Sequence, residues 1–171
     1  MTPPRLSVFE TGLKSGGVRM PTIVVPLSVL GMVPLVYFAC GAVAPGPETA
    51  ERMLVSLIDY AALALAFAGG VHWGLALLPG MARTGLRVLG GALPLAVAWV
   101  GLILAQLVSP SVALAVLILG YLATVLSEHR AARRLLVPAG YMWVRWGFSV
   151  VAITMIGMVL VLRGIGQTIV F

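Results

Sequence analysis

Five long apolar stretches constrain the fold of this chain more than any other feature. They cover residues 22–44, 53–78, 86–108, 111–127 and 144–162. Each comes close to, or exceeds, the about 20 residues that a helix needs to cross the hydrocarbon core of a bilayer. Lipid offers no hydrogen bonds to an exposed backbone, so a spanning segment of this length must be helical. We therefore predict an all-α polytopic bundle with five transmembrane helices.

Composition supports a membrane protein and argues against a nucleic-acid-binding one. The chain is 61% hydrophobic and 9% charged, whereas soluble domains are about 45–50% apolar and about 25% charged. Eleven basic residues exceed five acidic ones, but they lie in short loops and are not gathered on one folded surface, as nucleic-acid recognition requires. We expect a lipid bilayer as the surroundings and no nucleic acid as partner.

The basic residues predict the orientation of the bundle. Five crossings place nine of them on the side of the N-terminus and only Arg52 and Arg163 on the other side. Lys and Arg accumulate on the cytoplasmic side of membrane proteins, so the N-terminus is expected in the cytoplasm. Residues 1–20 are polar and form a disordered tail in this interpretation, followed by a transmembrane domain over 21–171. The Arg- and Ala-rich composition favours a bacterial inner (cytoplasmic) membrane.

His72 is the most informative polar residue because it lies inside the second apolar stretch. An ionisable side chain is costly in hydrocarbon and usually has a partner or a function. The direction of this helix places His72 about two turns from the cytoplasmic boundary, where Glu128 and Arg145 also lie at helix ends. We predict a functional polar cluster of these three residues. The structural alternatives are an interhelical hydrogen bond for His72, a solvated helix end for Glu128 and a snorkelling side chain for Arg145.

Asp59 and Gln106 form a second candidate site near the outer side. Asp59 lies about 20 Å from His72 along the same helix, and Gln106 approaches that level from the third stretch. We predict an outer polar pair, with a hydrated carboxylate as the alternative for Asp59.

Small residues predict where the second helix packs. Such residues recur every four positions and form a stripe suited to close helix–helix contact: Ala62, Ala66, Gly70 and Gly74. His72 lies about 200° around the helix from Gly70, on the face of Leu65 and Ala68. The helix would then pack on both faces at the centre of the bundle, and Gly69 would leave room beside His72. Trp99, central in the third stretch, is expected in the core.

No catalytic or metal-binding pattern is visible. Cys40 is the single cysteine, so neither a disulfide nor a thiolate metal cluster is supported. Nucleotide loops, zinc motifs and serine elbows are also missing. We predict no cofactor. Haem would need a second axial histidine, and His129 lies at a helix exit, so haem and quinone are kept as alternatives.

The stretch from Tyr60 to Gly74, which ends in Phe-Ala-Gly-Gly-Val-His-Trp-Gly, resembles the signature of the transmembrane protein 69-like family of small bacterial inner-membrane and mitochondrial proteins. Further similarity covers nearly everything after residue 20. It includes Pro94 with Ala98-Trp99, the acidic position at Glu128, and Pro138, Tyr141 and Arg145. The chain departs from the family pattern in having Glu at 128, Ala139-Gly140 before Tyr141, and Val144 before Arg145. The resemblance implies a multi-span inner-membrane protein and no assigned activity.

Three functions are compatible with these features. The first is a non-enzymatic accessory subunit or assembly factor that acts through helix packing, with other membrane subunits or a second copy as partner. The second is a carrier or proton-linked permease that uses Asp59, Gln106, His72 and Arg145 along one path. The third is a quinone- or lipid-binding protein, or an enzyme, with His72 near the cytoplasmic interface. Five spans without a visible inverted repeat argue against a conventional transporter, and the first reading is preferred.

Overall fold

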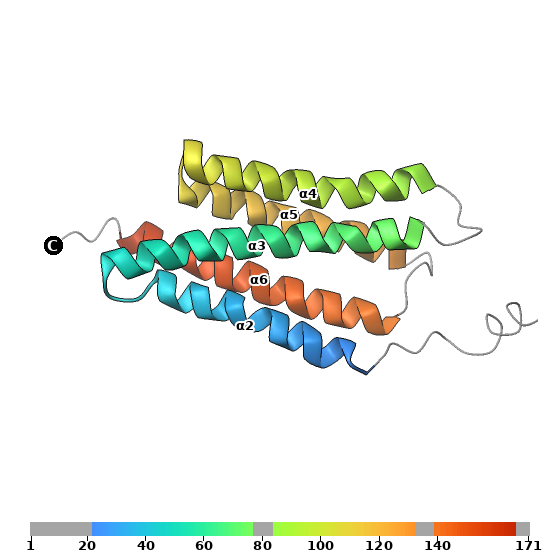
Figure 1. Ribbon diagram of the computed structural model, residues 1–171, viewed down its shortest axis with the longest axis horizontal. Helices are drawn as coiled ribbons and strands as arrows, with labels where there is room; N and C mark the ends of the chain where they lie inside the picture. Colours follow the sequence, from blue (N-terminus) through green and yellow to red (C-terminus); the bar gives the residue numbers. More distant parts are fainter. Residues whose placement is uncertain (1–21, 77–83, 133–138, 167–171) are drawn as a thin grey trace, which may run out of the picture.

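The computed structural model describes residues 22–76, 84–132 and 139–166. They form five helices and no strand: α2 (Val24–Ala42), α3 (Pro47–Ala76), α4 (Thr84–Leu107), α5 (Pro110–Ala132) and α6 (Ala139–Gly166) (Figure 1). All five are long and apolar enough to cross a membrane. The predicted all-α fold with five spans is therefore confirmed. The predicted tail at 1–20 lies outside the described residues.

Local sequence signals set the two short turns between helices. Gly46 adopts φ 121°, a left-handed conformation that favours glycine, and Pro47 follows as the first residue of α3, where its missing N–H costs nothing. Pro110 starts α5 in the same way, and the backbone N–H of Val112 donates to Ser109 Oγ at 3.3 Å, which caps the helix. Both turns lie at one end of the bundle, which we call the short-loop end (Figure 1).

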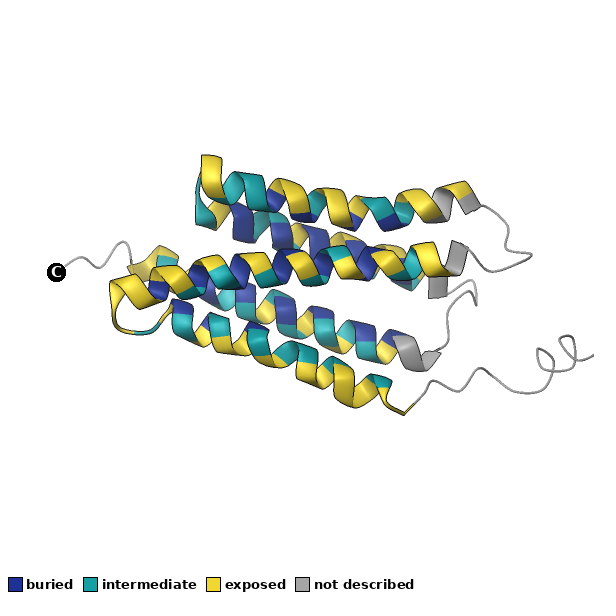
Figure 2. Cartoon of the chain, viewed as in Figure 1, coloured by how far each residue is buried: buried dark blue, intermediate teal, exposed yellow. Residues whose placement is uncertain are grey.

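The helices form a closed ring in the order α2, α3, α4, α5, α6, and α3 also contacts α5 across it. Helix α3 is the most enclosed. Of the 18 consecutive residues that make up its most apolar segment, 44% are buried, compared with 11% for the corresponding segment of α2. Dark blue residues accordingly line the inward faces of the helices, while the outer faces are yellow (Figure 2). The expectation that α3 packs on more than one face agrees with this arrangement.

The core between α3 and α5 combines close packing with one buried hydrogen bond. Tyr121 is fully buried, and its hydroxyl donates to the carbonyl oxygen of Ala61 at 2.9 Å. One turn further along α3, Leu65 lies so close to Gly120, the residue before Tyr121, that a Cβ on this glycine would come within 2.7 Å of the leucine side chain. These contacts fix the face of α3 that points into the bundle.

Helices α3 and α4 approach each other most closely where two glycines meet. A Cβ on Gly69 would come within 3.0 Å of the carbonyl oxygen of Gly91, and a Cβ on Gly91 would collide with the indole ring of Trp73. The Trp73 indole N–H donates to the carbonyl oxygen of Val88 at 2.9 Å. The expectation that Gly69 leaves room beside His72 is wrong, because this glycine makes the backbone contact between α3 and α4.

The small-residue stripe on α3 packs internally only in part. Ala62 is buried, but Gly70 and Gly74 are exposed, and no described residue lies within 4 Å of a Cβ built on either. Four residues turn a helix by about 400°, so a stripe with this spacing rotates by about 40° at each step. Gly74 has thus rotated about 120° away from Ala62, whereas Gly69, seven residues on, is only about 20° out of line. Gly70 and Gly74 therefore do not pack against another described helix of this chain, and the helix contact predicted for them stays a prediction.

Candidate functional site

Three helices bring His72, Glu128 and Arg145 together at the end of the bundle opposite the short-loop end. Arg145 Nε donates to both carboxylate oxygens of Glu128 at 3.0 Å. His72 Nε2 lies 3.7 Å from Glu128 Oε1. His72 comes from α3, Glu128 from α5 and Arg145 from α6. The three residues that were grouped from the sequence are therefore neighbours in the structure.

This cluster is enclosed, and its charges compensate each other. The side chain of Glu128 is 3% exposed and that of Arg145 is 9% exposed, while His72 is 15% exposed. A buried ion is tolerable only when it is paired and its remaining hydrogen-bonding groups are satisfied. With His72 neutral, the carboxylate and the guanidinium leave no net charge in the cluster.

Helical periodicity explains how His72 reaches this position. Leu65 and Ala68 are buried on the same face of α3, as predicted from their spacing with His72. On α5, Glu128 follows Tyr121 by seven residues, which returns it to nearly the same face. Because Tyr121 already faces α3 through its hydrogen bond to Ala61, Glu128 is directed toward α3 as well.

Helix α6 carries three buried donor groups close in sequence, the first of which belongs to Arg145 of this cluster. Among the described residues, no hydrogen-bond partner is present for Arg145 Nη2, Trp146 Nε1 or Ser149 Oγ. The Trp146 ring lies 5.4 Å from that of His129. Ser149 is fully buried and follows Arg145 by four residues, so both lie on one face of α6. The sequence interpretation missed Ser149, although this spacing from an intramembrane arginine could have indicated it.

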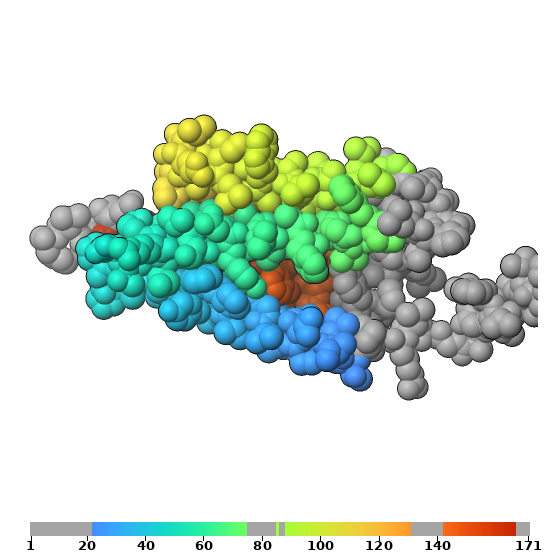
Figure 3. Space-filling view, in the orientation of Figure 1, coloured from blue at the N-terminus to red at the C-terminus, as the bar shows by residue number. Residues whose placement is uncertain are grey.

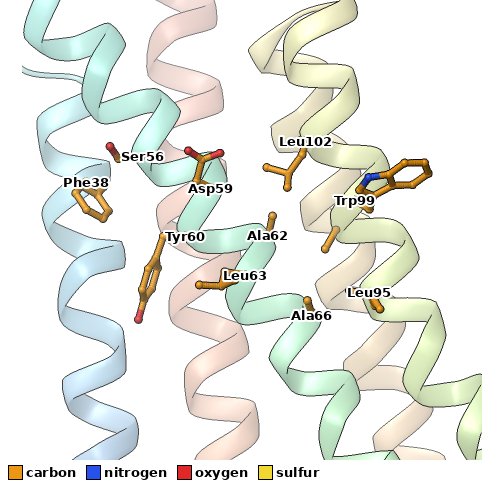
Figure 4. A pocket seen from close by; sticks show the side chains of 11 residues that line it. Phe38, Ser56, Asp59, Tyr60, Ala62, Leu63, Ala66, Leu95, Trp99 and Leu102 are labelled. Atoms are coloured by element: carbon orange, nitrogen blue, oxygen red, sulfur yellow. The ribbon is translucent and has the colours of Figure 1, made fainter.

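The predicted outer pair is not joined. Asp59 and Gln106 are both exposed, and in the described part of the chain neither an ion pair nor a hydrogen bond connects them. Asp59 instead faces a groove of about 560 Å³ on the outer surface of α3, between α2 and α4 (Figure 4). Its lining is otherwise mostly apolar: Phe38, Ser56, Tyr60, Ala62, Leu63, Ala66, Leu95, Ala98, Trp99 and Leu102.

Trp99 corrects a second expectation from the sequence. It lies on the α4 side of the groove (Figure 4) and is 64% exposed, although its central position in the span predicted core packing. A central position sets depth in the membrane but not the side of the helix, because a lipid-facing surface is as apolar as a core. The face formed by α2, α3 and α4 is visible in Figure 3, where part of α6 shows between α2 and α3.

Ion pairs at the short-loop end leave little free positive charge. Arg163 pairs with Glu51 and also donates from Nη1 to the carbonyl oxygen of Ala42 at 3.3 Å. Arg52 pairs with Glu48 one turn earlier on α3. Both basic side chains that the structure describes at this end are thus engaged within the chain.

The described residues contain no group of three or more His, Cys, Asp or Glu side chains that could hold a metal ion. No curated protein and no solved structure matches the chain. The resemblance to the transmembrane protein 69-like family stays a prediction. A family model described as "Protein of unknown function (DUF3429)" matches residues 20–161, and the chain therefore belongs to this family.

Proposed function

We propose that this protein is an accessory subunit or assembly factor of a complex in a bacterial inner membrane, and that it binds a transmembrane helix of another protein through the outer face of α3. The observation that carries the proposal is the bare surface at Gly70 and Gly74. Both glycines are exposed, and their Cβ positions have no described neighbour within 4 Å.

A glycine within a helix costs about 1 kcal/mol relative to alanine, so two exposed glycines in a membrane span need a reason. Gly69 has one in its contact with Gly91. For Gly70 and Gly74, an external helix supplies one, because apolar side chains gain little by leaving lipid and helices associate where small residues let their backbones approach. Toward the short-loop end, the groove lined by Ala66 continues this face of α3.

We also propose that the N-terminus lies in the cytoplasm, and the charge asymmetry supports this orientation. Nine basic residues are expected on the side of the N-terminus and two on the other, which favours a cytoplasmic N-terminus. The outer face of α3 would then meet its partner within the bilayer, with the short-loop end on the outer side.

The test compares two glycines that both lack internal contacts. Gly70→Leu fills the proposed docking face, whereas Gly157→Leu changes α6, where a Cβ also has no neighbour within 4 Å. We expect one protein to co-purify stoichiometrically with the wild type and with Gly157→Leu in mild detergent, and to be lost with Gly70→Leu. Circular dichroism and melting should show both variants folded. A strictly monomeric wild type, or equal recovery from both variants, would overturn the proposal.

The polar cluster supports a second candidate function, the binding of an amphiphile with acceptor oxygens such as a quinone or a phospholipid headgroup. Its basis is the three buried donors Arg145 Nη2, Trp146 Nε1 and Ser149 Oγ, which lack an acceptor among the described residues. Such donors are costly unless an acceptor is supplied. Mass spectrometry and absorbance of the purified protein should reveal a retained quinone or lipid that Ser149→Ala reduces. A protein that retains neither would eliminate this candidate.

A carrier receives less support from the geometry. One internal path would have to include Asp59 and Gln106, which are exposed, together with His72 and Arg145, which face the interior. We therefore prefer the packing role.

A further inference from the structure

Asp59 is an unpaired carboxylate within a membrane-spanning segment. No ion pair or hydrogen bond involves its side chain in the described part of the chain, and it is exposed on the outer face of α3. It lies seven residues after Arg52, the last charged residue before the apolar stretch, or about 10 Å along the helix. An ionised side chain at such a position requires water, an internal partner or an external one.

The groove around Asp59 lies on the outer surface of the bundle and within the membrane span. Leu102 lines the groove from α4 and precedes the end of that helix at Leu107 by five residues, which corresponds to about 8 Å. Figure 4 shows Asp59 between α2 and α4, with Ala62 and Ala66 following along the same side of α3. An apolar groove with one carboxylate near its end is suited to a long apolar partner that carries one basic group.

A second copy of this chain does not supply that group. A two-fold contact across this face would bring equivalent residues together at the same depth, and Asp59 would approach Asp59 of the other copy. The basic side chains at the short-loop end are Arg52 and Arg163, and both are already ion-paired with Glu48 and Glu51. A phospholipid phosphate would also be repelled by the carboxylate.

We infer that the partner is a transmembrane helix of a different protein, with a Lys or Arg at the depth of Asp59. This inference rests on the proposed function and adds the chemistry of the partner. Polar pairs between membrane helices stabilise association because the separated groups face hydrocarbon. The carboxylate then sets the register of the partner, while Ala66 and Gly70, each within about 20° of Asp59 around α3, set the distance of approach.

Site-specific photocrosslinking tests the inference in the native membrane. Benzoylphenylalanine at Leu63 or Leu95, which line the groove, should crosslink to one protein, and the same probe at Val150, which is exposed on α6, serves as the control. Mass spectrometry of the crosslinked peptide should identify a transmembrane segment with Lys or Arg within one turn of the attachment point. Asp59→Asn should lower the crosslinking yield by about tenfold, whereas Asp59→Glu should retain it.

A charge exchange completes the test. Asp59→Lys should abolish the crosslink, and replacing the identified basic residue of the partner with Asp should restore it. A partner segment without a basic residue near the crosslink, an unchanged yield with Asp59→Asn, or crosslinks to a second copy would overturn the inference, and the first two leave the docking role of α3 intact. Crosslinks to lipid alone, together with no co-purifying protein, would overturn both.

Discussion

Gly69→Ala tests the closest contact in the bundle, where α3 crosses α4. An alanine Cβ at this position would come within 3.0 Å of the carbonyl oxygen of Gly91, which is backbone and cannot rotate away. The two helices must therefore separate locally. Gly70→Ala is the matched control, because the neighbouring position has no described residue within 4 Å of its Cβ.

The comparison isolates the packing energy. Both substitutions replace glycine with alanine in the same helix, so the gain of about 1 kcal/mol from helix propensity is common to both. Overpacking a tight contact costs typically about 1–3 kcal/mol, and the contact with a backbone atom favours the upper part of this range. We expect Gly69→Ala to be less stable than Gly70→Ala by about 2–3 kcal/mol, with Gly70→Ala at least as stable as the wild type.

Equilibrium unfolding in mixed micelles with increasing sodium dodecyl sulfate measures the difference. Tryptophan fluorescence is a suitable signal because Trp73 lies against Gly91, and far-UV circular dichroism should show that both variants keep their helices. If the free energies of unfolding of the two variants differ by less than about 0.5 kcal/mol, the level of surface substitutions, the close crossing of α3 and α4 is refuted.

Three further predictions concern the interior and use the same unfolding measurement. Glu128→Gln and Arg145→Met should each destabilise the protein by about 3–5 kcal/mol, because each leaves the partner of a buried ion pair uncompensated. The double variant should lose clearly less than the sum, and strict additivity would contradict the pairing. Tyr121→Phe should lose about 1 kcal/mol through its hydrogen bond to the backbone of α3, and an unchanged stability would speak against that bond. Leu117→Ala, at a fully buried position, should cost about 2–5 kcal/mol, whereas Leu119→Ala, at a 64% exposed position, should cost less than about 1 kcal/mol. Equal losses would contradict the assigned face of α5.

The polar cluster could be anticipated because polar residues are scarce in these spans. Consecutive helices run in opposite directions, so the end of α3, the end of α5 and the start of α6 must meet at one end of the bundle. His72, Glu128 and Arg145 occupy these ends, and few other groups there could pair with a buried charge. The pair of Asp59 and Gln106 was inferred in the same way from depth alone. Among the described residues no hydrogen bond or ion pair joins these two side chains, although Gln106 follows the groove residue Trp99 by seven positions on α4.

The sequence by itself determined the number of helices, their approximate limits and the neighbours of His72, which are Glu128 and Arg145. The reason is that bilayer thickness and the cost of buried charge act on any chain of this composition. Only the tertiary structure decided which small residues pack internally. Apolar side chains gain little by moving from lipid into a protein core, so hydrophobic periodicity does not show which side of a membrane helix faces the bundle. The choice depended on close fit between helices: Gly69 meets Gly91, while Gly70, Gly74 and Trp99 face outward. The inward face of α6 carries Ser149, whose hydroxyl has no hydrogen-bond partner among the described residues.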